Sequence, residues 1–228
     1  MTTPRFAAAR RRRSVRAAAL GLALACLAAA ASARESRDGR SDAFDYYVLS
    51  LSWSPQYCAE SGGGREPLQC GGQRRYAFVL HGLWPQYEKG FPSDCASGGR
   101  LPASLVDDML DIMPSPSLVR HEWNAHGTCS GLPAGDFFAA ARRAYDSIAI
   151  PARYRTTPQQ VYVAPRQLER DFLDANPTLR AAGVVVLCNG RYLQEVRICL
   201  DRNLQPRACG RDVRDRCRTN ELIVRPVR

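Results

Sequence analysis

The cysteines constrain the fold of this chain more than any other feature of its sequence. Nine cysteines occur among 228 residues, and all but Cys26 lie at or after position 58. These eight are Cys58, Cys70, Cys95, Cys129, Cys188, Cys199, Cys209 and Cys217. An even number in an exported chain implies a framework of four disulfides, but eight cysteines can pair in about 105 ways. None are spaced as C-x-x-C, so a structural zinc knuckle is not indicated.

The first 33 residues predict the export that disulfide formation requires. They carry arginines at positions 5, 10–13 and 16, an apolar stretch from Ala17 to Ala30, and a final Ala31-Ser32-Ala33. A basic start, a short apolar segment and an A-x-A site are typical of a cleaved signal peptide. The apolar stretch is too short for a membrane anchor. We therefore expect residues 34–228 to be periplasmic or secreted, without stable membrane association.

Two other interpretations of the leader stay open. Cys26 would be the acylated residue of a lipoprotein, but Ala23-Leu24-Ala25 is a poor match to the small-residue context that acylation needs. The paired arginines permit Tat export, whereas cysteines that pair after export favour the Sec route. Removing the leader lowers the formal charge from +10 to +4. A mildly basic chain suits a polyanionic substrate without requiring one.

Hydrophobic periodicity predicts strands and helices that do not alternate regularly. Residues 45–53 and 75–80 have the pattern of strands, and the second runs directly into His81. Helical spacing is found at 102–113, at 136–149, and from Pro165 to just before Asn176-Pro177. Residues 183–188 and 191–200 flank Asn189-Gly190, a two-residue hairpin signal. Together these elements predict a single α+β domain, with a central antiparallel sheet and helices packed on it.

All three histidines occur in two short segments, HGLWPQ at 81–86 and HEWNAHGTCS at 121–130. Imidazole exchanges protons near neutral pH, so this concentration indicates proton-transfer chemistry. Neither segment has the pattern of a surface helix. The alternative, that the histidines are ordinary core residues, explains one isolated histidine better than three together.

The spacing of the second segment argues against a metal site. A zincin places its histidines four residues apart, whereas His121 and His126 are five apart. On a helix, five residues turn the second imidazole about 140° away from the first. Glu122 and His126, four apart, would share a face and form a carboxylate–imidazole unit. We therefore expect no metal and no other cofactor.

The two histidine segments closely resemble the catalytic signatures of the ribonuclease T2 family, HGLWP and HEWxxHGTC. The resemblance covers the chain after the leader, from YYVLSLSWSPQYC at 46–58 through FPSDC at 91–95 to ICLD at 198–201. It implies that residues 34–228 are one catalytic domain. The implied activity is metal-independent endonucleolytic cleavage of single-stranded RNA, with low base specificity, through a 2′,3′-cyclic phosphate to 3′-phosphate ends. We expect a monomer.

The resemblance also implies a role for each site residue. His126 would take the proton from the ribose 2′-OH, and His81 would protonate the leaving 5′-oxygen. Glu122 would assist at the phosphorane, and His121 would hold the phosphate. One imidazole can fill either proton-transfer role because its ordinary pKa is about 6.5.

Base binding is implied at three further positions. Trp84 would stack on a nucleobase, Phe91 would form the opposing wall, and Gln86 would bond a base edge. The alternatives are core aromatic residues and a surface amide.

The implied disulfides pair Cys58 with Cys70, Cys95 with Cys129, Cys188 with Cys217, and Cys199 with Cys209. One position departs from the family pattern, because the lysine that usually precedes the second histidine of HEWxxHGTC is Ala125 here. Either another cation such as Arg120 replaces that lysine, or the enzyme is slow. Two rival functions are a weakly active or inactive RNA-binding or signalling homologue, and a metal-dependent hydrolase.

Overall fold

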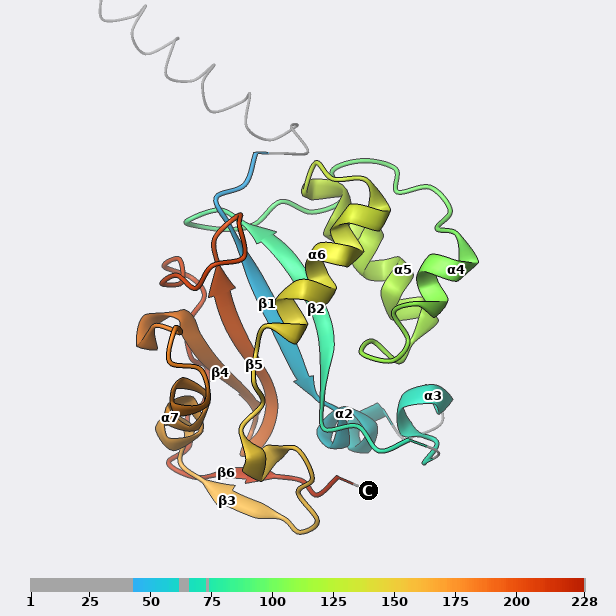
Figure 1. Ribbon diagram of the computed structural model, residues 1–228. Coiled ribbons are helices and arrows are strands. Elements are labelled where there is room, and N and C mark those ends of the chain that lie inside the picture. The colour runs from blue at the N-terminus through green and yellow to red at the C-terminus, as the bar shows by residue number, and fades with distance from the viewer. Residues whose placement is uncertain (1–42, 62–65, 73, 228) are drawn as a thin grey trace, which may run out of the picture. The chain divides into compact units, whose positions relative to one another are not determined.

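The structure is a computed structural model that describes residues 43–61, 66–72 and 74–227 (Figure 1). The predicted signal peptide at 1–33 lies outside these residues. A search of the described helices found none with the length and apolar character needed to cross a membrane.

The six strands of the described residues form one sheet in the order β2-β1-β5-β6-β3, with β4 paired to β5. The strands are β1 Tyr46–Trp53, β2 Phe78–Gln86, β3 Val161–Val163, β4 Val184–Asn189, β5 Tyr192–Leu200 and β6 Leu222–Val224. All pairs are antiparallel except β5 with β6, which is parallel. The predicted antiparallel centre is therefore confirmed, and β6 makes the sheet mixed.

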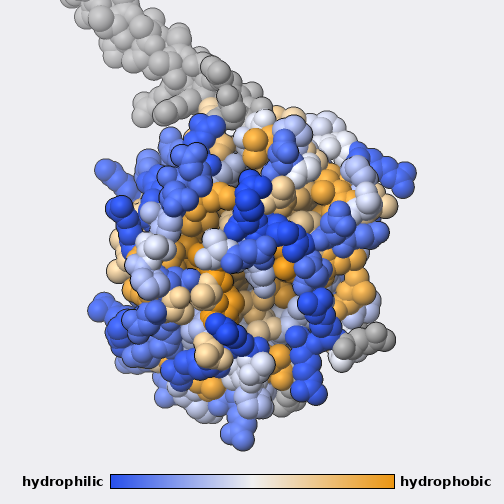
Figure 2. Space-filling model, viewed as in Figure 1, coloured by the Kyte–Doolittle hydropathy of each residue, from blue (hydrophilic) through white to orange (hydrophobic). Residues whose placement is uncertain are grey.

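Helices pack on this sheet, which confirms the α+β prediction. Those described are α2 Ser54–Ser61, α3 Pro67–Cys70, α4 Ala103–Asp107, α5 Pro116–Ala125, α6 Ala134–Asp146 and α7 Pro165–Ala175, with 3₁₀ turns η1 Gly127–Cys129, η2 Ala152–Tyr154 and η3 Ala181–Gly183. Helix α6 lies over β1 and β2, and α7 lies over β4 (Figure 1). Figure 2 shows mainly hydrophilic side chains on this outer face, with hydrophobic ones between them. The helices thus turn their apolar sides to the sheet.

Three elements differ from the sequence prediction. The strand predicted at 75–80 begins at Phe78 and continues through the HGLWPQ segment to Gln86. The helix predicted at 102–113 ends at Asp107 and is followed by turns, and the carbonyl of Ile112 accepts a hydrogen bond from the amide of Leu80. The hairpin loop is Gly190-Arg191, one residue later than predicted, and Gly190 supplies the positive φ of 58°.

The second histidine segment, which does not have the pattern of a surface helix, is nevertheless partly helical. Helix α5 contains His121 and Glu122 and ends just before His126. Its start is well specified, because the Ser115 hydroxyl accepts a hydrogen bond from the Leu118 amide and a proline follows at the first helical position.

A β-bulge sets the face of the sheet from which His81 projects. The pairing of β1 with β2 shifts between Ser50 and Leu51, so His81 has no partner across the strand. Leu80 and Leu83, three residues apart, consequently both reach the core and are fully buried. The extra residue reverses the strand's alternation and leaves His81 on the opposite face, as bulges beside active sites often do.

A second bulge has the same effect on β5. The pairing with β4 skips Gln194, so Leu193 and Val196 both lie in the core. Gln194 and Glu195 then face the same cavity as His81. Strands β2 and β5, on either side of β1, thus place polar side chains on one face of the sheet.

The disulfides of the described residues are Cys58–Cys70, Cys95–Cys129, Cys188–Cys217 and Cys199–Cys209. These are the pairs that the resemblance implies. The Cys95–Cys129 bridge ties the loop after β2 to η1, which directly follows His126.

Candidate active site

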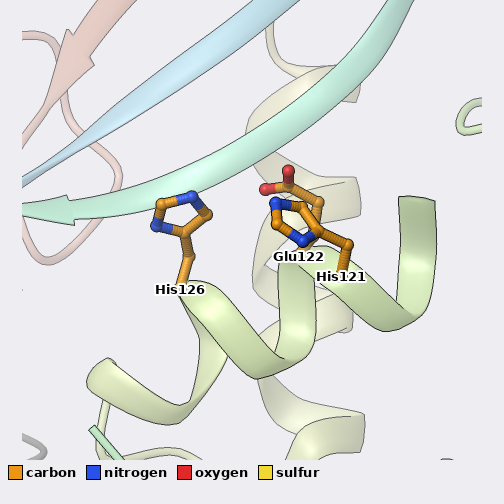
Figure 3. Close-up of side chains that lie close together, drawn as sticks. All are labelled: His121, Glu122 and His126. Carbon is orange, nitrogen blue, oxygen red and sulfur yellow. The ribbon is translucent and has the colours of Figure 1, made fainter. Parts of the chain in front are cut away.

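Strand β2 and helix α5 bring the two histidine segments together. His121, Glu122 and His126 project from the same side of the helical segment toward the strand (Figure 3). Trp84 lies close to both proposed proton-transfer histidines, with its ring centroid 5.2 Å from that of His81 and 5.4 Å from that of His126, which directly follows α5.

Close backbone approach at Gly82 lets the carboxylate of Glu122 reach the strand. A Cβ at position 82 would lie 2.0 Å from Oε2 of Glu122 and 2.3 Å from Nε1 of Trp84. That indole nitrogen donates a 2.7 Å hydrogen bond to the same Oε2. Glu122 is almost fully buried, with 1% of its surface exposed. A side chain at position 82 would therefore collide with Glu122 and Trp84, which explains the glycine in HGLWP.

His81 is held by two carboxylates. Its Nδ1 lies 2.5 Å from Oε1 of Glu195, and its Nε2 lies 3.9 Å from Oε1 of Glu122. Arg197 donates two hydrogen bonds, of 3.0 and 2.9 Å, to the other oxygen of Glu195. The Arg197 guanidinium also stands 4.8 Å from the ring centroid of Trp84.

Glu195 and Arg197 were missed by the sequence analysis. They are two residues apart on one strand, so they face the same side, between the core positions of β5. The available signal was a pair of opposite charges on one face of β5, whose other face is fully apolar. That signal does not say what the pair contacts, because the partner His81 is 114 residues away.

The pKa values of the two proposed proton-transfer histidines are displaced in opposite directions. Burial lowers the pKa of His126 to about 4, and the nearby charges of His121 and His81 act in the same direction. Burial also lowers the pKa of His81, but the hydrogen bond and charge of Glu195 and the charge of Glu122 outweigh it, so the net shift is upward. Two imidazoles with pKa values separated in this way can supply one base and one acid.

The pKa values of the two carboxylates beside His81, Glu122 and Glu195, are also shifted in opposite directions. Burial raises the pKa of Glu122 to about 7, with the charge of His81 and the Trp84 hydrogen bond only partly opposing it. Burial acts the same way on Glu195, but His81 and Arg197 outweigh it and lower that pKa to about 2. Glu195 is therefore the permanently charged carboxylate of the site.

Two cavities are lined by the histidines. One, of about 590 Å³, is lined by His81, His121 and Glu195 together with residues of α2 and α3. The other, of about 250 Å³, is lined by Val48, Trp84, Gln86, Phe91, His126, Arg197 and Val213.

All three predicted base-binding residues line the smaller cavity. Phe91 is 58% exposed, which is unusual for an aromatic ring with only a packing role. Gln86 is buried, and its amide donates to the carbonyl of Pro85.

His126 lies beyond the helix, with φ −125° and ψ −44°. The helical spacing that counted against a metal ion shared by His121 and His126 therefore does not apply. One ligand atom from each of His121, Glu122 and His126 lies within 4.8 Å of the others. Metal independence therefore stays a prediction.

The structure does not bring Arg120 to the cluster. Its side chain is exposed and donates to the carbonyl of Pro116 in the same helix. Ala125, where the family pattern has lysine, is buried at the end of α5. Among described arginines, Arg197 lines the cavity of His126.

Known proteins resemble this chain in sequence and in fold. A ribonuclease of Aeromonas hydrophila is 34% identical over 200 residues, which cover 83% of this chain and 89% of that protein. An RNase-related protein from Calystegia sepium has a similar structure, with a TM-score of 0.64 at 21% identity over 81% of this chain and 98% of the other. An RNase MC1 mutant in complex with 5′-UMP gives a TM-score of 0.62 at 21% identity, over 78% and 97%. These two likenesses show the fold. Residues 44–209 match the profile of the Ribonuclease T2 family, and the chain belongs to that family.

Proposed function

We propose that this protein is an endoribonuclease that cleaves single-stranded RNA through a 2′,3′-cyclic phosphate, with low base specificity. One observation carries the proposal: the rings of His81 and His126 both lie close to Trp84, each lines a different cavity, and their pKa values are shifted in opposite directions. Transfer of a phosphoryl group to a neighbouring hydroxyl needs one base and one acid on opposite sides of phosphorus.

In the first step, His126 acts as the base. Its lowered pKa keeps the imidazole neutral at mildly acidic pH. Its Nδ1 is buried and has no hydrogen-bond partner in the described part of the chain, so Nε2 is the nitrogen that meets substrate. As Nε2 takes the 2′-OH proton, the 2′-oxygen bonds to phosphorus.

His81 acts as the acid in the same step. Its raised pKa keeps the imidazole protonated, with Nδ1 engaged by Glu195. Nε2 gives its proton to the 5′-oxygen as the P–O5′ bond breaks. Glu122 and His121 face the phosphorane, where charge builds up. For hydrolysis of the cyclic product, His81 takes a proton from water and His126 returns one to the 2′-oxygen, which leaves a 3′-phosphate.

The two cavities set the direction of the RNA. The nucleotide whose 2′-OH attacks belongs in the smaller cavity, beside His126, where Trp84 and Phe91 offer aromatic faces to its base. The leaving nucleotide belongs in the larger cavity, beside His81. Stacking on aromatic rings tolerates every base, which supports low base specificity. The related RNase MC1 fold is known with a bound nucleotide, 5′-UMP.

We further propose that the protein acts as an exported monomer without a metal ion. Disulfides in the catalytic domain support an oxidising compartment, reached through residues 1–33. Metal independence is supported by a proton-transfer scheme that histidines complete alone.

The test uses a single-stranded RNA oligonucleotide with EDTA present. We expect cleavage that yields cyclic phosphate ends first and 3′-phosphate ends later. A matched strand with one 2′-deoxy sugar should resist cleavage just 3′ of that sugar, because the nucleophile is missing. Cleavage there at an unchanged rate would show that an activated water attacks instead, and loss of all cleavage in EDTA would indicate a metal-dependent hydrolase.

A weakly active RNA-binding homologue is the second candidate, and Ala125 in place of the usual lysine favours it. Tight RNA binding without turnover in the same assay would establish it.

A further inference from the structure

The unassigned pair Glu195 and Arg197 lies directly behind the proposed acid. Oε1 of Glu195 is 2.5 Å from Nδ1 of His81, while Oε2 accepts both hydrogen bonds from Arg197. Glu195 is only 5% exposed, so its charge is held away from water. A buried carboxylate is stable only when it is paired and hydrogen-bonded, and each of its oxygens has a partner here.

We propose that Glu195 is a positioning residue for His81, and that Arg197 holds Glu195 in place from the other side. The carboxylate keeps the proton on Nδ1 and fixes the ring, so that Nε2 is the nitrogen facing the reacting phosphate. An acidic side chain that orients a catalytic imidazole in this way works through the histidine and does not touch the substrate. The assignment rests on the proposed function, because it explains how His81 acts as an acid.

The strand geometry supports this assignment. The bulge on β2 exposes His81, and the bulge between β4 and β5 turns Glu195 toward the same cavity. The two side chains face each other across β1, where Ser50 and Ser52 leave room for them.

The electrostatic surroundings of His81 allow a directional test. Among the described residues, the charged or titratable groups around it are Glu195 and Arg197 from β5, Glu122 and His121 from α5, His126 just beyond α5, and Tyr57, Glu60 and Glu66 in the larger cavity. Glu195 raises the pKa of His81 and Arg197 lowers it. Removing each of the two charges in turn should therefore shift the pKa of His81 in opposite directions.

The experiment is an NMR titration of His81, assigned with His121→Ala and His126→Ala variants. We expect Glu195→Gln, which keeps the shape but removes the charge, to lower the pKa of His81. Arg197→Gln should raise it. Glu221→Gln, which removes one partner of the exposed Arg191 ion pair, is the matched control and should leave it unchanged. A general loss of structure would not give opposite shifts, and an unchanged His81 in Glu195→Gln would overturn the proposal.

Kinetics on RNA give the second measurement. Glu195→Gln should lower kcat on the order of 10²-fold with little change in KM, and should move the alkaline limb of the pH profile to lower pH. Wild-type kcat in this variant would also overturn the proposal. Because the titration needs no turnover, a wild-type protein that does not cleave RNA would refute the proposed function without affecting the His81–Glu195 result.

Discussion

Nε1 of Trp84 donates a hydrogen bond to Oε2 of Glu122 over 2.7 Å, and this bond joins the strand motif to the helix motif. The indole therefore has two roles, because it also lines the smaller cavity where we place a base. Trp84, which the family resemblance assigns to base stacking, thus also fixes the carboxylate of Glu122, which we place near the reacting phosphate.

The first prediction concerns Gly82, which makes this contact possible. We expect Gly82→Ala to lower kcat/KM for RNA about 10²-fold, because the new methyl group would displace Glu122 and Trp84. The melting temperature should also fall, because Glu122 is buried and the indole ring is rigid, so neither can move aside freely. Gly135→Ala is the control, because a Cβ there meets nothing within 4 Å. Normal activity of Gly82→Ala would show that the Trp84–Glu122 contact is not needed.

The second prediction concerns the acid and the base. His81→Ala and His126→Ala should each reduce RNA turnover by about 10²- to 10⁴-fold, the usual contribution of a general acid or base. Far-ultraviolet circular dichroism should show an unchanged fold. His121→Ala should act mainly on KM, because that residue is assigned to phosphate binding. Near-normal turnover in either of the first two variants would refute the mechanism.

The third prediction is a bell-shaped pH dependence with an acidic optimum. Activity should rise as the pH increases through about 4, where His126 loses its proton and becomes a base. It should fall as the pH increases past the raised pKa of His81, which lies above the ordinary 6.5, because the acid then loses its proton. Measuring kcat/KM across this range at constant ionic strength tests both limbs. A steady increase into alkaline solution would contradict the assignment.

The fourth prediction concerns the absent lysine. Arg120 is bonded to its own helix and Arg197 is held by Glu195, so we expect Ala125→Lys to supply a cation that the phosphorane lacks. Steady-state kcat/KM should rise by about tenfold, or about 1.4 kcal/mol of transition-state stabilisation. Arg120→Ala should have no effect on the same assay. A lysine variant that is no faster than wild type would mean that the phosphate is already fully stabilised.

The fifth prediction concerns the bridge between Cys95 and Cys129, which closes a loop of 34 residues. Replacing both with alanine should lower the free energy of unfolding by about 3 to 4 kcal/mol, measured by denaturant titration. Removing Cys58–Cys70, which closes 12 residues, should cost about 1 kcal/mol less. The reverse order would mean that loop length does not govern these bridges.

The sequence by itself determined the fold class, the helix from Pro165, the β4–β5 hairpin and the family. These follow from local signals, such as a proline at a helix start and apolar periodicity, that act over a few residues. It also named His81, Glu122 and His126, because their motifs are contiguous segments that resemble those of a known family.

Only the tertiary structure decided how these residues are arranged. The bulge that turns out His81 depends on pairing with β1, which the alternation within β2 does not reveal. The partnership of His81 with Glu195 spans 114 residues, and the opposed pKa shifts come from burial and charges that those distant contacts create. Sequence periodicity reports which face a side chain occupies within its own element. Which side chain it meets depends on how the strands and helices pack.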